Sequence, residues 1–194
     1  GKGRALIVRA RGRGHGLGPL GRRPQAPRPG VEWVQGDLDD SAALARLSAG
    51  AGAVIHVAGL VNAADLADFE LVFVSSLSAR EPLLSAYGAS KLRAEELVRS
   101  SRLDWTIVQP PAVYGPRDEA LFELFRAATW GVVPTPKQGR ASLIHVEDLA
   151  RLLLALVPGG EAVTHRLFEP DGGKPGGWDH AELARAIGEA VGRR

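Results

Sequence analysis

The stretch of sequence that decides the fold is Leu71-Val-Phe-Val-Ser-Ser76, followed after a short gap by Ser85-Ala-Tyr-Gly-Ala-Ser-Lys-Leu-Arg-Ala-Glu95. The first part is a continuous apolar run that ends in two serines, which is typical of a parallel strand buried on both faces. The second part has helical spacing, with small and apolar residues recurring on one side. A buried strand followed by such a helix predicts a βαβ unit of a parallel sheet.

The same alternation of short apolar runs and helical segments extends outward from this stretch. Further strands are predicted at residues 31–34, 53–57, 105–108 and 143–146. Helices are predicted at residues 43–47, 86–98, 119–129 and 147–156, with a last one capped by Asp179. The pattern predicts a doubly wound α/β sheet, in which ligands bind at the carboxyl ends of the strands.

Tyr87 and Lys91 are four residues apart, so a helix places both side chains on one face. A tyrosine phenol is a poor base near neutrality, but a nearby ammonium favours the phenolate. The pair can therefore exchange a proton with a substrate oxygen. Ser76, at the end of the preceding strand, can donate a hydrogen bond to the same oxygen. The alternative for the bare spacing is an exposed tyrosine and lysine on a surface helix.

Composition and charge exclude several classes of protein. The chain has 194 residues, no cysteine and a formal net charge of +2, so it has neither a disulfide framework nor a thiolate metal site. No side-chain pattern predicts a metal site of another kind. The basic cluster between Arg4 and Arg28 indicates a phosphate-binding corner or a solvated face more than nucleic-acid binding, because the total charge is near neutral. No apolar run is long enough for a membrane span and no secretory signal is visible, so a cytoplasmic protein is expected.

Four further motifs follow the same order along the chain: Gln35-Gly-Asp-Leu38, Val54-Ile-His-Val-Ala-Gly59, Gln109-Pro-Pro-Ala-Val-Tyr-Gly-Pro-Arg117 and Leu143-Ile-His-Val-Glu-Asp-Leu-Ala150. Together with the deciding stretch, they resemble the extended or atypical short-chain dehydrogenase/reductases, also called NAD-dependent epimerase/dehydratase proteins. The resemblance covers residues 31–157. It implies a Rossmann-type doubly wound sheet at residues 1–115 and 141–157, with a small C-terminal substrate lobe at residues 116–140 and 158–194.

The resemblance implies a role for each matching residue. Tyr87 is the acid/base, Lys91 activates it and holds the nicotinamide ribose, and Ser76 polarises the carbonyl, with Ser75 and Ser78 as fallback candidates. The other residues implied to line the cofactor are Asp37, Leu38, Ala58, Gly59, Val74, Ser75, Pro110, Pro111, Ala112 and Val113. Those implied on the substrate side are Ser78, Tyr114, Arg117 and Arg140.

Some of these positions have simpler alternatives. Asp37 is equally explained as a turn residue after a strand, and Pro110-Pro111 as a strand terminator. His56 and His145 lie inside apolar runs, where a hydrogen-bonded core histidine is expected more often than a catalytic one.

The glycine turn that opens this family has two possible registers here. Gly16-Leu-Gly-Pro-Leu-Gly21 has the spacing of the phosphate-binding turn, but no clear strand precedes it. In the second, preferred register, residues 3–10 are the family's first helix and residues 16–23 its second strand. Arg22 and Arg23 then lie near the adenosine ribose, which favours NADP over NAD because arginines suit a 2′-phosphate. A solvated basic turn is the alternative.

Two features suggest that segments of the protein are missing from this sequence. It contains no methionine, and only eleven residues separate Gly59 from Leu71, fewer than a parallel crossover with a full helix needs. We expect the first strand with its glycine turn, and part of this crossover, to be the missing segments.

The resulting prediction is an NAD(P)-dependent oxidoreductase or epimerase that acts on an alcohol or ketone carbon of a small molecule. A sugar nucleotide, a flavonoid-like ketone and a sterol all fit. The alternative is a non-catalytic dinucleotide-binding sensor or an accessory subunit of a respiratory complex. The resemblance also leaves open a homodimer through the helix at residues 85–98.

Overall fold

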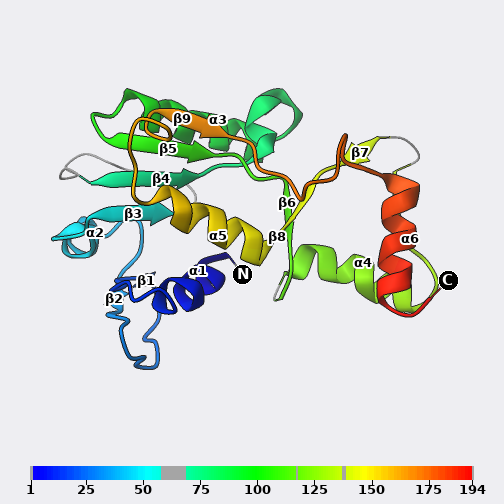
Figure 1. Ribbon diagram of the computed structural model, residues 1–194, viewed down its shortest axis with the longest axis horizontal. Helices are drawn as coiled ribbons and strands as arrows, with labels where there is room; N and C mark the ends of the chain where they lie inside the picture. Colours follow the sequence, from blue (N-terminus) through cyan, green and yellow to red (C-terminus); the bar gives the residue numbers. More distant parts are fainter. Residues whose placement is uncertain (1, 58–68, 117, 137–138, 194) are drawn as a thin grey trace.

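The computed structural model describes residues 2–57, 69–116, 118–136 and 139–193 (Figure 1). Its core is a four-stranded parallel sheet in the order β3–β4–β5–β9. These strands are β3 (Ala53–His56), β4 (Glu70–Val74), β5 (Asp104–Val108) and β9 (Arg166–Phe168). The sheet confirms the predicted doubly wound parallel architecture.

Side chains of β4 alternate between two apolar clusters, as expected for a strand with both faces covered. Leu71 and Phe73 pack with Ala94 and Val98 of α3 (Ala86–Ser100) on one face. Val72 and Val74 lie on the other face, where α1 (Lys2–Arg11) and α5 (Val146–Leu156) cover the sheet. Helices on both faces make β4 one of the most deeply buried elements of the molecule.

Beyond β3, a second pair of parallel strands lies close to α1 (Figure 1). It consists of β1 (Leu20–Gly21) and β2 (Val34–Gln35). The predicted short helix follows as α2 (Ser41–Ser48), whose first turn is capped by the Asp40 carboxylate, 2.9 Å from the Ala43 amide. Two short 3₁₀ helices, η1 (Leu77–Arg80) and η2 (Pro82–Leu84), connect β4 to α3.

The C-terminal part of the chain forms a smaller group of elements to one side of the core (Figure 1). The parallel pair β6 (Ala112–Tyr114) and β8 (Leu143–His145) leads to it. The group itself contains α4 (Glu119–Thr129), α6 (His180–Ala190) and the antiparallel pair of β7 (Arg140–Ala141) and β10 (Trp178–Asp179). Asp179 caps α6, as the sequence predicted.

Two observations refine the organisation expected from the sequence. The chain runs from α1 into β1, which is the second of the two registers, so Gly16 to Gly21 lead into a strand and form no turn into a helix. β9 belongs to the core sheet although it comes from the range 158–194 expected for the lobe. The crossover after Gly59 lies outside the described residues. Within them, no helix is both long and apolar enough to cross a membrane.

His56, at the end of β3, is half-buried and lacks the hydrogen bonds expected of a core histidine. Its ring lies 5.6 Å from the Phe73 ring between centroids, and both ring nitrogens are buried with no hydrogen-bond partner among the described residues. Burial, together with the positive charge of Lys91, lowers the pKa of His56 to about 4. The imidazole is therefore neutral at pH 7.

This histidine predicts an acid-sensitive stability. Between the ordinary pKa of 6.5 and about 4, the unfolded chain binds a proton at His56 that the folded chain does not. The free energy of unfolding should therefore decrease as the pH is lowered through that window, by up to about 3 kcal/mol. His56→Leu should abolish this part of the loss, and His15→Leu, at an exposed histidine, should not. Urea denaturation at neutral pH and at the acidic end of the window measures both; equal losses in the two variants would contradict the prediction.

Candidate active site

The predicted catalytic residues Ser76, Tyr87 and Lys91 all lie near the carboxyl ends of β4 and β5. The ladder between these strands continues past their ends, with the Ser75 amide 2.8 Å from the Val108 carbonyl oxygen and the Leu77 amide 3.1 Å from that of Pro110. Ser76 and Pro110 are thereby held side by side at one edge of the sheet. The first turns of α3, which carry Tyr87 and Lys91, cover this edge.

Lys91 is a buried cation at the centre of this arrangement. It is 7% exposed, and its Nζ donates a hydrogen bond to the Val74 carbonyl oxygen at 3.2 Å. Its Nζ also lies 5.8 Å from the centroid of the Tyr87 ring and 5.6 Å from that of Phe73. Burial and the charge of Lys2 lower the pKa of Lys91, whereas the charge of Glu95 raises it.

Tyr87 is accessible where Lys91 is buried. Its side chain is 52% exposed, so the phenol faces solvent on one side and the Lys91 ammonium on the other. The structure thus places the accessible ring of Tyr87 next to the buried ammonium of Lys91.

Ser76 lies in the turn that packs against α3. Its side-chain oxygen accepts a hydrogen bond from the Ser78 amide at 3.3 Å and caps η1. Gly88 allows this turn to approach α3, because a Cβ at that position would overlap the Ser78 carbonyl oxygen. The glycine next to Tyr87 thus sets how close the serine turn comes to the tyrosine.

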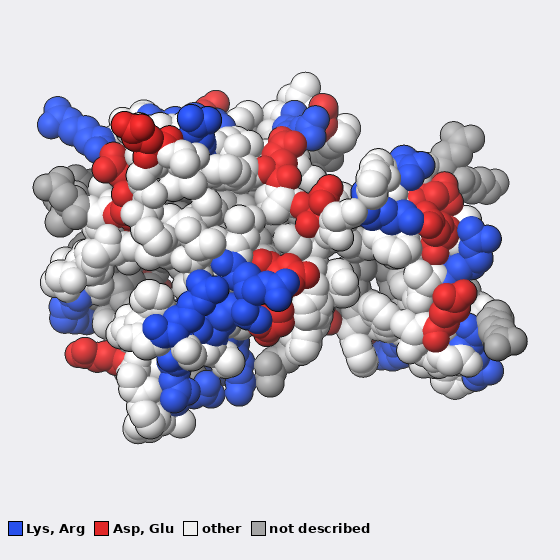
Figure 2. Space-filling view, in the orientation of Figure 1, with Lys and Arg blue, Asp and Glu red and all other residues white. Residues whose placement is uncertain are grey.

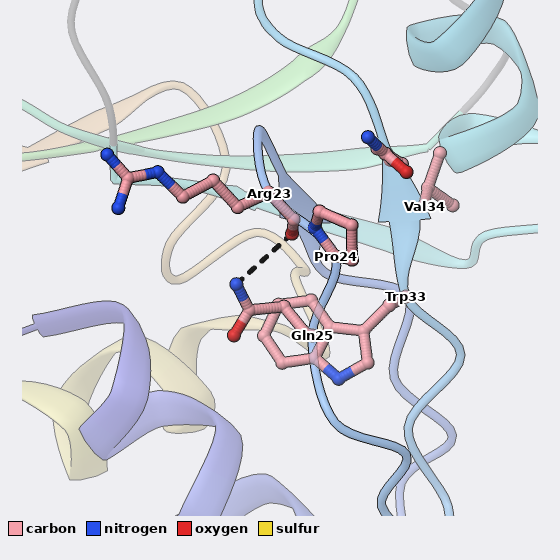
Figure 3. Close-up of a pocket in the computed structure, with 7 residues that line it drawn as sticks. Arg23, Pro24, Gln25, Trp33 and Val34 are labelled. Atoms are coloured by element: carbon pink, nitrogen blue, oxygen red, sulfur yellow. Dashed lines mark hydrogen bonds between the residues drawn. The ribbon is translucent and has the colours of Figure 1, made fainter.

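Beside β1 and β2 lies a shallow hollow of about 200 Å³, lined by Gly21, Arg23, Pro24, Gln25, Trp33, Val34 and Gln35. Of the residues expected near the adenosine, Arg23 lines it, whereas Arg22, Asp37 and Leu38 do not. Figure 3 shows the Gln25 amide turned toward the Arg23 carbonyl oxygen, which accepts its hydrogen bond at 3.2 Å, while the Arg23 guanidinium extends away from the Trp33 ring. Arg22 and Arg23 are both exposed. The Trp33 indole nitrogen is buried without a partner among the described residues. The hollow therefore has an aromatic wall, Trp33, and one exposed cation, Arg23.

Asp37 and Leu38 follow β2 near this hollow. The Asp37 carboxylate accepts a hydrogen bond from the Asp39 amide at 3.0 Å. This contact is the one expected of a turn residue after a strand. Leu38 is half-buried.

The N-terminal end of α1 lies at the same end of the core sheet as the carboxyl ends of the strands (Figure 1). The helix contains no acidic residue, and Figure 2 shows Lys and Arg side chains gathered over it. Burial lowers the pKa of Lys2, and the charge of Asp118 opposes this shift. Lys2 and Lys91 are close enough for their charges to interact. The positive N-terminal end of α1, with Lys2 on it and Lys91 of α3 nearby, suits the phosphate groups of a dinucleotide.

The positions after β5 differ in exposure. Pro110 is fully buried, Pro111 and Val113 are half-buried, and Ala112 is exposed. The Tyr114 ring lies 5.2 Å from that of His145, edge to face. His145 accepts a hydrogen bond from the Glu147 amide at 3.3 Å and so caps α5, which is a structural role.

Arg140 lies in the lobe, where its guanidinium donates hydrogen bonds to the carbonyl oxygens of Gly176 and Gly177. These contacts hold the loop before β10. Ser78 is exposed beside Ser76, and their side-chain oxygens are 3.3 Å apart. Ala58, Gly59 and Arg117 lie outside the described residues.

Sequence reasoning missed Glu95, Gln109 and Lys2. Glu95 is buried and accepts a hydrogen bond from Gln109 at 2.7 Å. Its spacing of four from Lys91, which repeats the spacing of Lys91 from Tyr87, was the available signal. Lys2 gave no signal, because its place beside Lys91 depends on tertiary packing.

A doubly wound parallel sheet with this cluster at its carboxyl edge defines a Rossmann-type dinucleotide-binding domain. A family model described as NAD(P)H-binding matches residues 1–158. The chain belongs to this NAD(P)H-binding family.

A curated protein of known name is similar in sequence to this chain. A ceramide reductase of Caulobacter vibrioides is 43% identical over 147 residues, which are 64% of this chain and 46% of that protein. The chain thus spans about half the length of this curated relative.

Solved structures show the same fold at lower identity. A short-chain dehydrogenase/reductase superfamily protein from Agrobacterium tumefaciens with bound NAD gives a TM-score of 0.73 at 18% identity, over 100% of this chain and 80% of that one. UDP-N-acetylglucosamine 4-epimerase from Bacillus cereus gives 0.74 at 18% identity, over 100% and 79%. The predicted fold of the short-chain dehydrogenase/reductase and epimerase proteins is confirmed.

Gly88 provides a test of the packing that forms the site. Gly88→Ala should push α3 away from the Ser78 carbonyl and destabilise the protein by about 1–3 kcal/mol. The matched control is Gly188→Ala in α6, where the added Cβ meets only the Arg193 carbonyl oxygen at 3.5 Å; it should be neutral or stabilising by up to about 1 kcal/mol. Thermal denaturation measures both, and an unchanged melting temperature for Gly88→Ala would contradict the close approach.

Proposed function

We propose that this protein is an NAD(P)-dependent reductase of a ketone carbon, with Tyr87, Lys91 and Ser76 as its reaction centre. The observation that carries the proposal is the buried Lys91 ammonium, fixed on the Val74 carbonyl and facing the ring of an accessible tyrosine. A binding protein without turnover could use Lys91 to hold the nicotinamide ribose, but it has no need of an exposed phenol beside that lysine. This supports an enzyme over the dinucleotide sensor or the accessory subunit of a respiratory complex.

The proposed chemistry is the addition of a hydride and a proton across a carbonyl group. Bound NAD(P)H supplies the hydride. Tyr87 donates the proton to the carbonyl oxygen, and the Lys91 ammonium stabilises the phenolate that is left. Ser76 donates a hydrogen bond to the same oxygen while negative charge develops on it. The reverse direction oxidises an alcohol with the same groups.

Several residues would hold the dinucleotide. The N-terminal end of α1 and Lys2 would face its phosphates, and the hollow beside Trp33 would take the adenosine end. Lys91 would also contact the nicotinamide ribose. Pro111 and Val113, which follow β5 and are half-buried, would flank the nicotinamide ring.

For the substrate, we propose a lipid ketone. The curated relative is named as a ceramide reductase. In this chain, Leu83 and Leu84 of η2 are almost fully exposed directly before the helix that carries Tyr87. Such residues are unusual beside a polar reaction centre and suit an aliphatic substrate. Sugar nucleotides remain the competing substrate class, because the fold is shared with a UDP-sugar epimerase.

Removing the phenol should abolish turnover and leave cofactor binding intact. Tyr87→Phe should lower kcat for reduction of a long-chain ketone in detergent micelles by about 100-fold or more, because proton transfer loses its donor. The measurement is NAD(P)H oxidation at 340 nm, with the fluorescence titration of each dinucleotide as the control for binding. Lys91→Met should reduce both kcat and dinucleotide affinity. Tight dinucleotide binding without turnover of any ketone or UDP-sugar by the unaltered protein would favour the sensor.

Cofactor preference rests on the arginines after β1. If Arg22 and Arg23 meet a 2′-phosphate, changing both to alanine should raise the Kd for NADPH about tenfold or more and leave that for NADH nearly unchanged. Arg185→Ala, on the exposed side of α6, should change neither constant. Equal weakening of both dinucleotides, or of neither, would point to the alternative of a solvated basic turn.

A further inference from the structure

Glu95 is an acidic side chain in the core of the protein. Its side chain is 1% exposed, although it lies on α3, whose outer face is open to solvent. A carboxylate in such surroundings is strongly destabilising unless it is paired and hydrogen-bonded. Its partners therefore indicate what the buried charge does.

The Glu95 carboxylate joins three elements of the site. One oxygen, Oε1, accepts hydrogen bonds from the Ser75 hydroxyl and, at 2.7 Å, from the Gln109 side-chain amide. Ser75 immediately follows β4 and Gln109 immediately follows β5. The other oxygen accepts a hydrogen bond from Arg99, one turn further along α3, at 3.0 Å. One side chain thus ties α3 to both strand ends.

These strand ends and this helix carry the reaction centre. Ser76 follows Ser75, Pro110 follows Gln109, and Lys91 precedes Glu95 by one helical turn. A shift of α3 along the sheet would break the hydrogen bonds of Glu95 and separate Tyr87 from the serine turn.

Glu95 also contributes charge to the surroundings of Lys91. Burial and the charge of Lys2 on α1 lower the pKa of Lys91, and Glu95 opposes both. Among the residues that the structure describes, this region also holds Tyr87 and Arg99 on α3 and His56 on β3, and the pKa of His56 is lowered by burial and by Lys91. Glu95 is the negative charge that favours a protonated Lys91 in this group.

We propose that Glu95 is a positioning residue for the reaction, which locks α3 to the ends of β4 and β5 and keeps the Lys91 ammonium beside Tyr87. The inference deepens the proposed function and rests on it. Glu95 itself does not contact the substrate. It acts through Ser75, Gln109 and Lys91.

The test compares Glu95→Gln with Glu96→Gln, the neighbouring and exposed glutamate on the same helix. In Glu95→Gln, we expect kcat for ketone reduction to fall about tenfold or more with KM little changed, because the defect lies in orientation and charge. The alkaline limb of the kcat profile should move to lower pH by about one unit, because Lys91 loses the charge that holds its proton. Glu96→Gln should match the unaltered protein. An alkaline limb and kcat that stay unchanged in Glu95→Gln would overturn the proposal.

A second readout needs no substrate and so separates this inference from the proposed function. The chain contains four lysines, so the ¹³Cε resonance of Lys91 can be assigned with Lys91→Arg and titrated by NMR. Its pKa should be lower in Glu95→Gln than in Glu96→Gln, whether or not the protein turns over a ketone. Equal Lys91 pKa values in the two variants would contradict the inference. Absence of ketone turnover by the unaltered protein would contradict only the proposed function.

If Glu95→Gln does not fold, Ser75→Ala tests the same network more gently. It removes one hydrogen bond to Glu95 and keeps the buried charge. We expect kcat to fall severalfold while the alkaline limb stays in place. A kcat equal to that of the unaltered protein would overturn the positioning role.

Discussion

β4 and β5 pair in parallel over five residues, from Glu70 opposite Asp104 to Val74 opposite Val108. This ladder is the constraint on which the site depends, because it ends both strands at the same height. The backbone bonds that extend it then place Ser76 next to Pro110. The Lys91 side chain reaches down to the last residue of β4 and fastens the helix to it. The placement of these residues is thus a consequence of strand register.

The site combines an exposed phenol with buried charges. Lys91 and Glu95 are both removed from water and lie one helical turn apart, and each is satisfied by groups at the strand ends. Buried charges of this kind are fixed in position, because any displacement leaves them unpaired. Tyr87 gains a rigid electrostatic environment while it remains open to a ligand.

Much of this arrangement could be predicted from the sequence, but unevenly. The run from Leu71 to Ser76 is continuous and apolar and the segment that follows has helical spacing, so the type and order of both elements were predicted correctly. The catalytic roles of Ser76, Tyr87 and Lys91 stay predictions. β9 was missed because Arg166 to Phe168 is too short to show a pattern. The burial of Glu95 was not predictable either, since a glutamate on an amphipathic helix is normally exposed. The first thirty residues allowed two registers, and only the packing of α1 on the sheet distinguishes them.

The position of β9 also affects how the protein can be divided. Its three residues extend the core sheet at β5, and the chain reaches them only after it has visited the lobe through β6, α4 and β8. A shortened protein that stops after α5 would lose the lobe's last helix and this edge strand together. β5 would then be left with unpaired backbone groups along the apolar run from Trp105 to Val108, which is a surface that invites aggregation. A stable minimal fragment of this domain must therefore extend past Phe168.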